Sequence, residues 1–482
     1  MFKRLKLQSN QWMILVLMMM WALLLLYVNM PWLGHHDANG VWIGAAARNL
    51  LTYGPSQIGL IPVLSRGPIP PDVPNIYVHH PPLMVWLTAL SEILFGVSEM
   101  SVRLVSIFPT MISIAAFYVM CRRLYDAKTG LVCAIFYAFT PMLIYFGRMP
   151  DHEPLSLAFL MLFGAVYINW VKKPTIQRWW ILAVLVIAAV WTSWACVFVI
   201  GAFCFFGLWA VQVKQRLPLI GLGIVTVLAM ISVVGLYYLQ FPNTFVDLVA
   251  AFNWRTSTVS EVSNSFTIVE FAGETLVHIV AGGTLGLTIL CLIGIIPALR
   301  VKNRLQQTTI LALAASGLAY ILVFRSASYV HDYYKIYLIP FMAITAAYVV
   351  VYTFRRPHIR RFAQPALTSL LIISSLWAVV IVNSWYFKTR DDILLHMADY
   401  IATNTTKSDT VLTNIFLNPP LEYYAFRKMV WEVQPADVNK QAVGKSPAVY
   451  FYCPWVDKPD NEHPHSDAEA IAACQLTKVP SG

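Results

Sequence analysis

Residues 179–213 read WWILAVLVIAAVWTSWACVFVIGAFCFFGLWAVQV, a continuous apolar stretch that decides how often the chain crosses a membrane. A spanning helix needs about 20 mostly apolar residues, because each residue rises about 1.5 Å through a hydrocarbon core of about 30 Å. The stretch is too long for one such helix, so we predict two, divided near Trp194 and Ala195. A single helix would place every later loop on the opposite side of the membrane.

The same length criterion predicts eleven spans. They are residues 12–30, 104–120, 131–146, 155–171, 179–195, 196–213, 219–239, 276–299, 308–324, 336–354 and 367–387. The composition agrees, since 58% of the residues are hydrophobic and 12% are charged, whereas soluble domains carry about 25% charged residues. The first span is long and no small-residue cleavage site follows it, so we expect it to be retained. The expected fold class is an all-α polytopic membrane protein.

The basic residues test this topology, because Lys and Arg gather in the cytoplasmic loops of membrane proteins. One alternate set of loops holds 18 basic residues and one acid, Asp126; the basic residues are Lys3, Arg4, Lys6, Arg122, Arg123, Lys128, Lys172, Lys173, Arg178, Lys214, Arg216, Arg300, Lys302, Arg304, Arg355, Arg356, Arg360 and Arg361. The net charge of +10 is therefore an orientation signal and does not indicate a nucleic-acid partner. The N-terminus is predicted to be cytoplasmic.

Eleven spans from a cytoplasmic N-terminus place the C-terminal tail outside. We predict two domains, a transmembrane module at 1–387 with a large outside loop at 31–103, and a small extracytoplasmic α/β domain at 388–482. In the tail, 391–403 has helical spacing, and Val411–Leu412 and 448–452 read as strands. No CxxC pair is present, which argues against a cysteine metal site, while Cys453 and Cys474 lie in the polar tail, where a disulfide can form if the tail is outside the cell.

Asp37 follows the first span directly and is the first candidate for chemistry. Asp37 or Asn39 could simply cap a helix from Val41 to Leu51. The functional interpretation is a carboxylate at the membrane surface, beside His35 and His36, that accepts a proton from a polar acceptor.

Two further outside segments combine proline with titratable residues. In 77–83, the double proline suits a turn that starts a helix, while His79 and His80 could donate hydrogen bonds to a phosphate. In 148–154, Asp151 suits a helix cap, which leaves His152 and Glu153 unexplained. Asp151, His152 and Glu153 could also bind a divalent cation, so a metal is possible although none is required.

The fourth segment, 325–335, contains His331-Asp332-Tyr333-Tyr334 before the tenth span. It could be an interfacial belt of tyrosines with snorkelling cations. Alternatively, Arg325, His331 and Lys335 hold an anionic headgroup, with Arg255 as a further candidate. All four segments fall on the same predicted side of the membrane, and this gathering of charges predicts a polar cavity there.

The order of these features resembles a known family. It comprises Asp37 after the first span, an amphipathic helix, His80-Pro81-Pro82-Leu83 with Trp86, Phe95-Gly96, Val102-Arg103-Leu104, an acidic second loop and His331-Asp332-Tyr333-Tyr334. Over residues 10 to about 390, this pattern is similar to the polyprenyl-phosphate-dependent glycosyltransferases of the GT-C fold, the branch with protein O-mannosyltransferases and the aminoarabinose transferases of lipid A.

The resemblance implies an enzyme of a bacterial-type cell membrane that moves a sugar from a polyprenyl-phosphate donor to an acceptor outside, with inversion. Asp37 then matches the acid that activates the acceptor, and Asp151 or Glu153 matches a second acidic position. Arg255, Arg325, His331 and Lys335 are phosphate-clamp candidates by location. His80 stands where several relatives have Lys, so its charge would depend on protonation.

Two other classes stay open at this stage. A transporter or lipid flippase would show charged or broken helices near the midplane, whereas the predicted spans are almost uncharged. An O-antigen ligase or polymerase would also use a lipid-linked sugar outside the cytoplasm. The donor in each glycosyltransferase reading is a lipid, so the absence of a Gly-rich phosphate-binding loop fits the prediction.

Overall fold

The computed structural model describes residues 8–69, 75–259, 265–388, 390–445, 447–457 and 466–479. Lys3, Arg4 and Lys6, counted above in the first basic loop, lie outside the described residues. The described residues divide into two compact units: the first falls within Met1–Val28, Val78–Met84 and Arg103–Ser384, and the second within Asn29–Tyr77, Val85–Val102 and Trp385–Gly482. Each unit is described by itself below.

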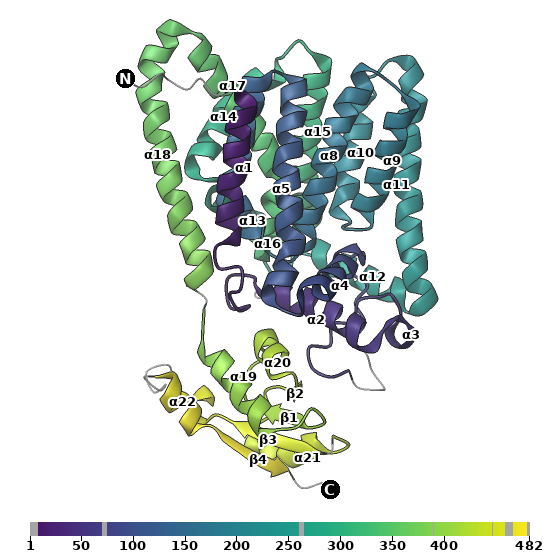
Figure 1. The fold of residues 1–482 in the computed structure, drawn as a ribbon, viewed down its shortest axis with the longest axis vertical. Coiled ribbons are helices and arrows are strands. Elements are labelled where there is room, and N and C mark those ends of the chain that lie inside the picture. The colour runs from purple at the N-terminus through teal and green to yellow at the C-terminus, as the bar shows by residue number, and fades with distance from the viewer. Residues whose placement is uncertain are drawn as a thin grey trace. The chain divides into compact units, whose positions relative to one another are not determined.

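The first unit is a bundle of helices that run alongside one another (Figure 1). Its elements are α1 (Ser9–Leu25), most of α5 (Glu99–Leu124), α6 (Ala127–Ala138), α7 (Pro141–Phe146), α8 (His152–Lys172), α9 (Ile176–Val190), α10 (Ala195–Gly207), α11 (Val213–Gln240), α12 (Thr244–Thr256), α13 (Ile268–Gly283), α14 (Leu285–Leu299), α15 (Arg304–Val323), α16 (Arg325–Val330), the 3-10 helix η1 (Asp332–Leu338), α17 (Ile339–Arg355) and most of α18 (Pro357–Phe387). Among the described residues, six helices are long and apolar enough to cross a membrane, or seven if one bent pair counts as a span. The chain is a multi-pass membrane protein.

The predicted division of the long apolar stretch is confirmed. α9 ends at Val190 and α10 begins at Ala195. Between them, the hydroxyl of Thr192 donates to the carbonyl of Ala188 at 2.8 Å, and the hydroxyl of Ser193 accepts from the amide of Ala195 at 3.2 Å. Hydroxyl side chains that bond to nearby backbone groups compete with helix continuation, which explains a break inside an apolar run.

Two other predicted spans are interrupted. The range 131–146 breaks where Thr140 caps α7 with a hydrogen bond from the amide of Leu143, and Pro141 begins that helix. The range 276–299 bends by 108° between α13 and α14, where Thr284 takes a φ of +76° and caps α14. The helical membrane fold is confirmed, and the count of eleven spans stays a prediction.

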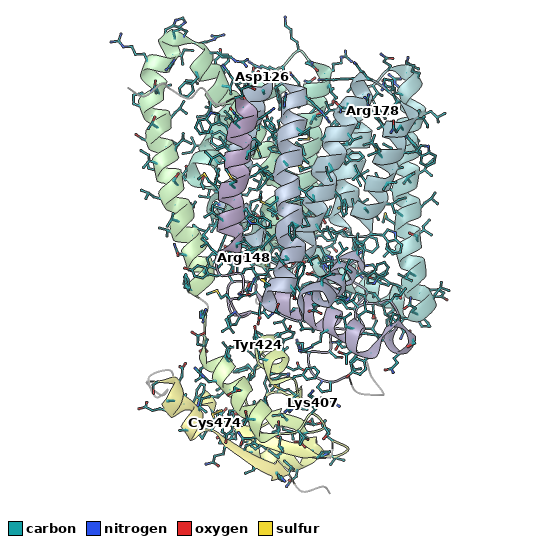
Figure 2. All side chains as sticks on the ribbon, viewed as in Figure 1. Asp126, Arg148, Arg178, Lys407, Tyr424 and Cys474 are labelled. Atoms are coloured by element: carbon teal, nitrogen blue, oxygen red, sulfur yellow. A yellow bond between two sulfur atoms is a disulfide. The ribbon has the colours of Figure 1, made fainter. Side chains whose placement is uncertain are left out.

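The charged loops of the bundle separate to its two ends. Figure 2 shows Asp126 and Arg178 at one end of the helices and Arg148 toward the other. The count of basic residues assumed that successive loops alternate between the two ends. Asp126 and Arg178 lie in the loops rich in basic residues, and Arg148 lies in the opposite set. Which end faces the cytoplasm stays a prediction.

The second unit combines helices from the first long loop with an α/β tail. Its elements are α2 (Ala38–Tyr53), α3 (Pro55–Ile58), most of α4 (Leu83–Phe95), α19 (Ile393–Asn404), β1 (Thr410–Thr413), α20 (Pro419–Ala425), β2 (Lys428–Val430), η2 (Pro435–Asp437), α21 (Val438–Ala442), β3 (Ala448–Tyr452), η3 (Pro454–Asp457), α22 (Asp467–Ala473) and β4 (Gln475–Val479). The sheet order is β2-β1-β3-β4, with β1 parallel to β2 and β3, and β4 antiparallel to β3. The two strands expected near 411 and 448 are both present.

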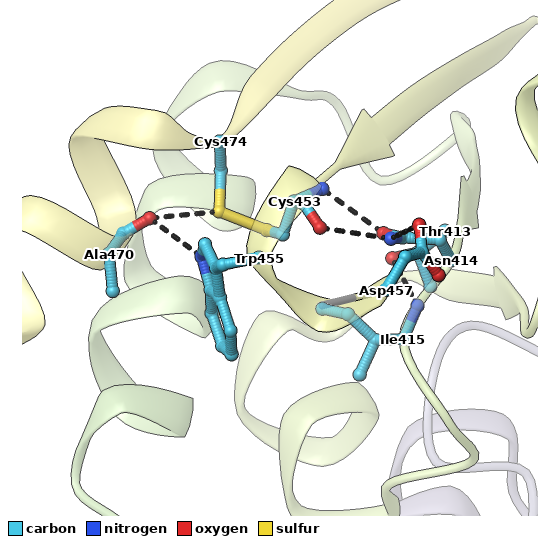
Figure 3. Close-up of a disulfide and its surroundings, with 8 residues drawn as sticks. All are labelled: Thr413, Asn414, Ile415, Cys453, Trp455, Asp457, Ala470 and Cys474. Carbon is cyan, nitrogen blue, oxygen red and sulfur yellow. Dashed lines mark hydrogen bonds between the residues drawn. A yellow bond between two sulfur atoms is a disulfide. The ribbon is translucent and has the colours of Figure 1, made fainter. Parts of the chain in front are cut away.

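The tail has its own hydrophobic core and one disulfide. Ile401, Val411 and Phe451 are fully buried within it. Cys453 and Cys474 are joined by the disulfide (Figure 3), as their position in the tail predicted. Beside it, the side-chain amide of Asn414 donates to the carbonyl of Cys453 at 2.9 Å, so the residue that follows β3 is tied both to Asn414 and to Cys474.

Specific polar contacts join the first long loop to the tail within this unit. Arg66 forms an ion pair of 2.7 Å with Glu422, and the hydroxyl of Tyr424 donates to Glu99 at 2.7 Å while accepting from the amide of Trp32 at 2.9 Å. The loop 29–77 is thus grouped with the tail in the compact division. The proposed domain boundary at 387/388 stays a prediction.

Candidate active site

The segment with His79 and His80 is fixed to the helix bundle through its backbone. The indole of Trp194 donates to the carbonyl of His79 at 2.9 Å, and the hydroxyl of Tyr237 donates to the carbonyl of His80. The amide of Leu83 donates to the carbonyl of Trp191 at 3.2 Å. These contacts fix the backbone of the segment against the ends of α9 and α10 and against α11.

These two histidines line a cavity of about 470 Å³ in the first unit. Most of its wall is apolar and comes from α10, α11 and α12, including Phe198, Met230, Val234, Phe245, Leu248 and Phe252. The polar side chains in the wall include those of His79, His80, Arg255 and Tyr334. A mainly hydrocarbon cavity with one guanidinium suits an amphipathic anion better than a free sugar.

The histidines at this cavity are neutral at physiological pH. Burial lowers the pKa of His80 well below its ordinary 6.5, and the neighbouring His152 and Arg255 lower it further. Burial, followed by the charge of Arg255, lowers the pKa of His79 to about 4. Neither imidazole is a fixed cation, so Arg255 supplies the positive charge among these polar wall residues, and His80 differs in this respect from the lysine of the relatives it resembles.

A pair of carboxyl groups, the partly buried Asp151 and the buried Glu153, lies at the start of α8 next to His152. Asp151 accepts the amide of His152 at 2.7 Å, as its predicted capping role requires, and Glu153 and Tyr333 are close enough to act on its pKa. Two neighbouring carboxyl groups repel each other when both are ionised, so the pair favours holding one proton. Burial raises the pKa of Asp151 to about 6, and Glu153 is 2% exposed, with an Oε2 that has no hydrogen-bond partner among the described residues.

His152 connects this carboxyl pair to the cavity. Its ring stacks on that of His80 with centroids 4.4 Å apart and planes within 10°. The three predicted residues Asp151, Glu153 and His80 are therefore brought together, with Arg255 close enough to act on the pKa of Asp151 and His80.

Two arginines in the quoted motifs have a structural role. Arg148 donates to the carbonyls of Leu26 and, at 2.9 Å, Tyr27. Arg103, fully buried, donates to the carbonyl of Val28 at 2.9 Å. These carbonyls belong to the turn that follows α1, so both side chains hold that turn in place.

The structure does not bring Lys335 to the cavity. Its ammonium group is fully buried and donates to the carbonyls of Ser328 and His331. It also contacts Nδ1 of His278 at 2.9 Å, and Nε2 of His278 lies 3.2 Å from Glu274. Three acceptors use the three ammonium hydrogens, so Lys335 anchors η1 and is not placed to hold a ligand phosphate.

Arg325 is also placed away from the cavity wall. Its side chain is exposed and its Nε donates to the carbonyl of Thr256 at 2.8 Å. His331, partly buried, packs against Tyr333 with ring centroids 5.2 Å apart, and burial lowers its pKa to about 4. Of the four predicted clamp residues Arg255, Arg325, His331 and Lys335, only Arg255 is a cation in the cavity wall.

Asp37 belongs to the second unit and begins α2. Its side chain is 7% exposed and accepts the amide of Gly34 at 3.0 Å. It makes no capping hydrogen bond to the first turn of α2. The purely structural interpretation as a helix cap is therefore not supported, and its role in proton transfer stays a prediction.

Sequence reasoning missed three contributors to this region. Glu274 and His278 lie on α13, Glu274 just before the predicted span 276–299 and His278 inside it. Tyr320 stacks on Tyr334 with centroids 4.9 Å apart and lines the cavity. The i, i+4 spacing of Glu274 and His278 was a readable signal for a polar helix face, whereas nothing in the sequence distinguished Tyr320 from other membrane tyrosines.

The possible metal ligands Asp151, His152 and Glu153 do not form a three-ligand cluster in the described part of the chain. No group of ligand atoms from these three residues lies within 4.8 Å of one another. A cation at this loop stays a prediction without geometric support.

Solved structures identify the fold. ArnT from Cupriavidus metallidurans bound to undecaprenyl phosphate superposes with a TM-score of 0.66 at 14% identity, covering 93% of this chain and 94% of that chain. The chain has the GT-C fold. The oligosaccharyltransferase of Archaeoglobus fulgidus in its apo form shares the GT-C fold at a TM-score of 0.56, covering 90% of this chain and 65% of that chain at 14% identity.

Sequence comparisons agree with the GT-C assignment over part of the chain. Residues 79–237 match the family described as dolichyl-phosphate-mannose-protein mannosyltransferase. An undecaprenyl phosphate-alpha-4-amino-4-deoxy-L-arabinose arabinosyl transferase of Pseudomonas paraeruginosa is 30% identical over 120 residues, which is 24% of this chain and 21% of that relative. The alignment thus spans about a fifth of the curated relative. The resemblance predicted from the motifs is confirmed.

Proposed function

We propose that this protein is a glycosyltransferase that takes a sugar from a polyprenyl-phosphate donor and passes it to an acceptor at the extracytoplasmic face of a bacterial-type cell membrane. The observation that carries the proposal is the apolar cavity with Arg255 in its wall, near the carboxyl pair Asp151 and Glu153. The names of the relatives, which specify undecaprenyl phosphate and dolichyl phosphate, support a lipid phosphate as the donor.

Arg255 is proposed to bind the donor phosphate. A guanidinium presents donors in a fork that matches two phosphate oxygens, and it keeps its charge at every physiological pH. The neutral His79 and His80 are proposed to add hydrogen bonds, and the apolar wall from α10 to α12 is proposed to hold the first part of the polyprenyl chain. The phosphate therefore binds at a single cation inside a hydrocarbon environment, where electrostatic attraction is little screened.

The proposed reaction is a direct displacement at the anomeric carbon. The acceptor oxygen forms a bond to that carbon, the bond from carbon to the phosphate oxygen breaks, and its electron pair leaves with the lipid phosphate. Asp37 is proposed to accept the proton of the acceptor, and Arg255 to stabilise the charge of the leaving phosphate. Attack opposite the leaving group inverts the configuration. No cofactor is needed for these steps.

Asp151 and Glu153 are proposed to form the second acidic position. Their shared proton leaves a net charge of one on the pair at neutral pH, which limits repulsion of the donor phosphate. Through His152, the pair also fixes the ring of His80 against the cavity. We propose a hexose or pentose as the transferred sugar, since both kinds appear in the names of the relatives.

The test is a transfer assay with purified full-length protein in lipid nanodiscs. A polyprenyl-monophosphate sugar carrying a radiolabel in the sugar should be consumed, with release of polyprenyl phosphate, and Asp37→Asn should stop consumption while leaving donor binding intact. Use of an oligosaccharide-diphosphate lipid in place of the monophosphate would indicate a ligase or polymerase. Movement of an intact lipid or solute across the membrane, without bond cleavage, would indicate a transporter or flippase.

A further inference from the structure

Another pocket, of about 610 Å³ and with a more polar wall than the first cavity, lies in the first unit. It is at the end of the bundle that carries Asp126, away from Arg148 (Figure 2). Three connections form it: the turn between α5 and α6, the connection between α14 and α15, and the last turns of α17. Its wall includes Tyr125, Asp126, Arg300, Lys302 and Arg355. The candidate active site includes Asp151, which lies in the set of loops opposite to that of Asp126. Among the residues that the structure describes, the two sites share no wall residue and are therefore separate.

The pocket carries an excess of positive charge. Arg355 is paired with Asp126, which neutralises one cation. The side chains of Arg300 and Lys302 make no hydrogen bond or ion pair with any other residue that the structure describes. Both residues are exposed to solvent, so their two positive charges are available to an anionic ligand in the pocket. The positive-inside preference explains cations in these loops, but it does not require a pocket around them.

A buried donor in the same pocket has no partner. The hydroxyl of Tyr125 is shielded from solvent and makes no hydrogen bond within the described residues. Burial raises the pKa of this phenol well above its ordinary 10, so it remains an O–H donor at every physiological pH. A buried polar group without a partner is costly, and an unexplained one often marks a ligand or ion site.

Apolar side chains share the pocket wall with these polar groups. Val301, Val351 and the rings of Tyr348 and Tyr352 lie beside the cations. Because α17 belongs to a candidate membrane span that ends at Arg355, the pocket lies where the headgroups of a bilayer would be. The partner that fits cations, an O–H donor and apolar walls at this depth is a phosphate attached to lipid chains.

We propose that this pocket binds the phosphate headgroup of an anionic membrane phospholipid, with Arg300 and Lys302 as the charge partners and Tyr125 as a hydrogen-bond donor. The bound lipid would join three connections that are distant in sequence. Nothing in this proposal depends on the glycosyltransferase reaction.

The test measures lipid binding to the purified full-length protein by native mass spectrometry and by thermal melting in detergent. Phosphatidylglycerol and cardiolipin should bind and raise the melting temperature, whereas phosphatidylcholine should not. The double variant Arg300→Gln, Lys302→Gln should weaken phosphatidylglycerol binding about thirtyfold, at roughly 1 kcal/mol per basic residue near a lipid surface. The matched control is Lys214→Gln, Arg216→Gln, which removes the same charge from exposed residues outside the pocket.

A second variant separates binding from folding. Tyr125→Phe should reduce phosphatidylglycerol affinity about fivefold, the value of one hydrogen bond, without lowering the melting temperature of the lipid-free protein, because it removes a buried group that has no partner. Equal loss of binding in the Lys214 and Arg216 control would overturn the pocket in favour of general surface charge. Equal protection by inorganic phosphate at the same concentration would overturn the lipid as the ligand.

Discussion

Replacing Arg255 with glutamine should weaken donor binding much more than the same replacement of Arg325. Both residues are arginines near the same stretch of chain, since Arg325 donates to the carbonyl of Thr256, the neighbour of Arg255. Only Arg255 lines the apolar cavity. The two variants remove the same charge from the protein, so any difference between them measures position.

The magnitude follows from the surroundings of Arg255. The nearby His79 and His80 are held neutral by burial, so no other cation among them replaces the lost charge. A hydrogen bond to a charged group contributes about 1.5 to 3 kcal/mol, which corresponds to a loss of donor affinity of roughly 10- to 150-fold. For the exposed Arg325, an effect below about threefold is expected, as for most surface charges.

The assay is equilibrium binding of a short-chain polyprenyl phosphate to nanodisc-embedded protein, measured by scintillation proximity. Arg255→Gln should lose affinity within the stated range while the protein keeps its melting temperature. Arg255→Lys should restore part of the affinity, because the charge returns without the fork geometry. Unchanged affinity in Arg255→Gln, or an equal loss in Arg325→Gln, would refute this assignment of the phosphate site.

Three further predictions concern stability and pH. Cys453→Ser should lower the free energy of unfolding of the tail by about 3 kcal/mol, since the disulfide closes a loop with a sequence separation of 21, and limited proteolysis should cut the tail of this variant first. His278→Ala should destabilise the protein by about 2 kcal/mol because it leaves the buried ammonium of Lys335 one acceptor short, whereas His278→Gln should recover part of the loss in thermal melting. Burial raises the pKa of Asp151 from 3.8 to about 6, so the unfolded chain releases this proton first and stability falls as pH rises between these values; the melting temperature of Asp151→Asn should depend less on pH over that interval.

Much of the membrane fold could be predicted because hydrophobic length and loop charge are local properties of the sequence. The break between α9 and α10 lies near the predicted division, which followed from a run too long for one span. The bend at Thr284 could not be predicted in this way. The length and apolar composition of a segment are the same whether it forms one straight helix or a bent pair.

The sequence predicted which residues gather at the candidate site, but not which partners their side chains contact. Asp151, Glu153 and His80 do come together, because prolines and caps fix the two segments that carry them. Arg325 and Lys335 were expected to bind phosphate on the basis of charge and position along the chain. Their side chains are instead used by backbone carbonyls and His278, and a sequence does not show which acceptor a cation will find.

The sequence also did not predict that the first long loop belongs to the same compact unit as the tail. Residues 29–77 read as part of the membrane module because they lie between two spans. Their ion pair with Glu422 and their hydrogen bond to Tyr424 depend on residues more than 300 positions away. Such long-range pairs leave no local pattern.

The most direct test of the account is photo-crosslinking with a polyprenyl phosphate that carries a diazirine in its first isoprene units. Peptide mass spectrometry should find the label on the cavity-facing residues of α11 and α12, at Met230, Val234, Phe245, Leu248 and Phe252, and excess unlabelled polyprenyl phosphate should abolish it. Label spread over the exposed surface of α18, at residues such as Leu376 and Val380, and insensitive to competitor would contradict a lipid-phosphate site in this cavity.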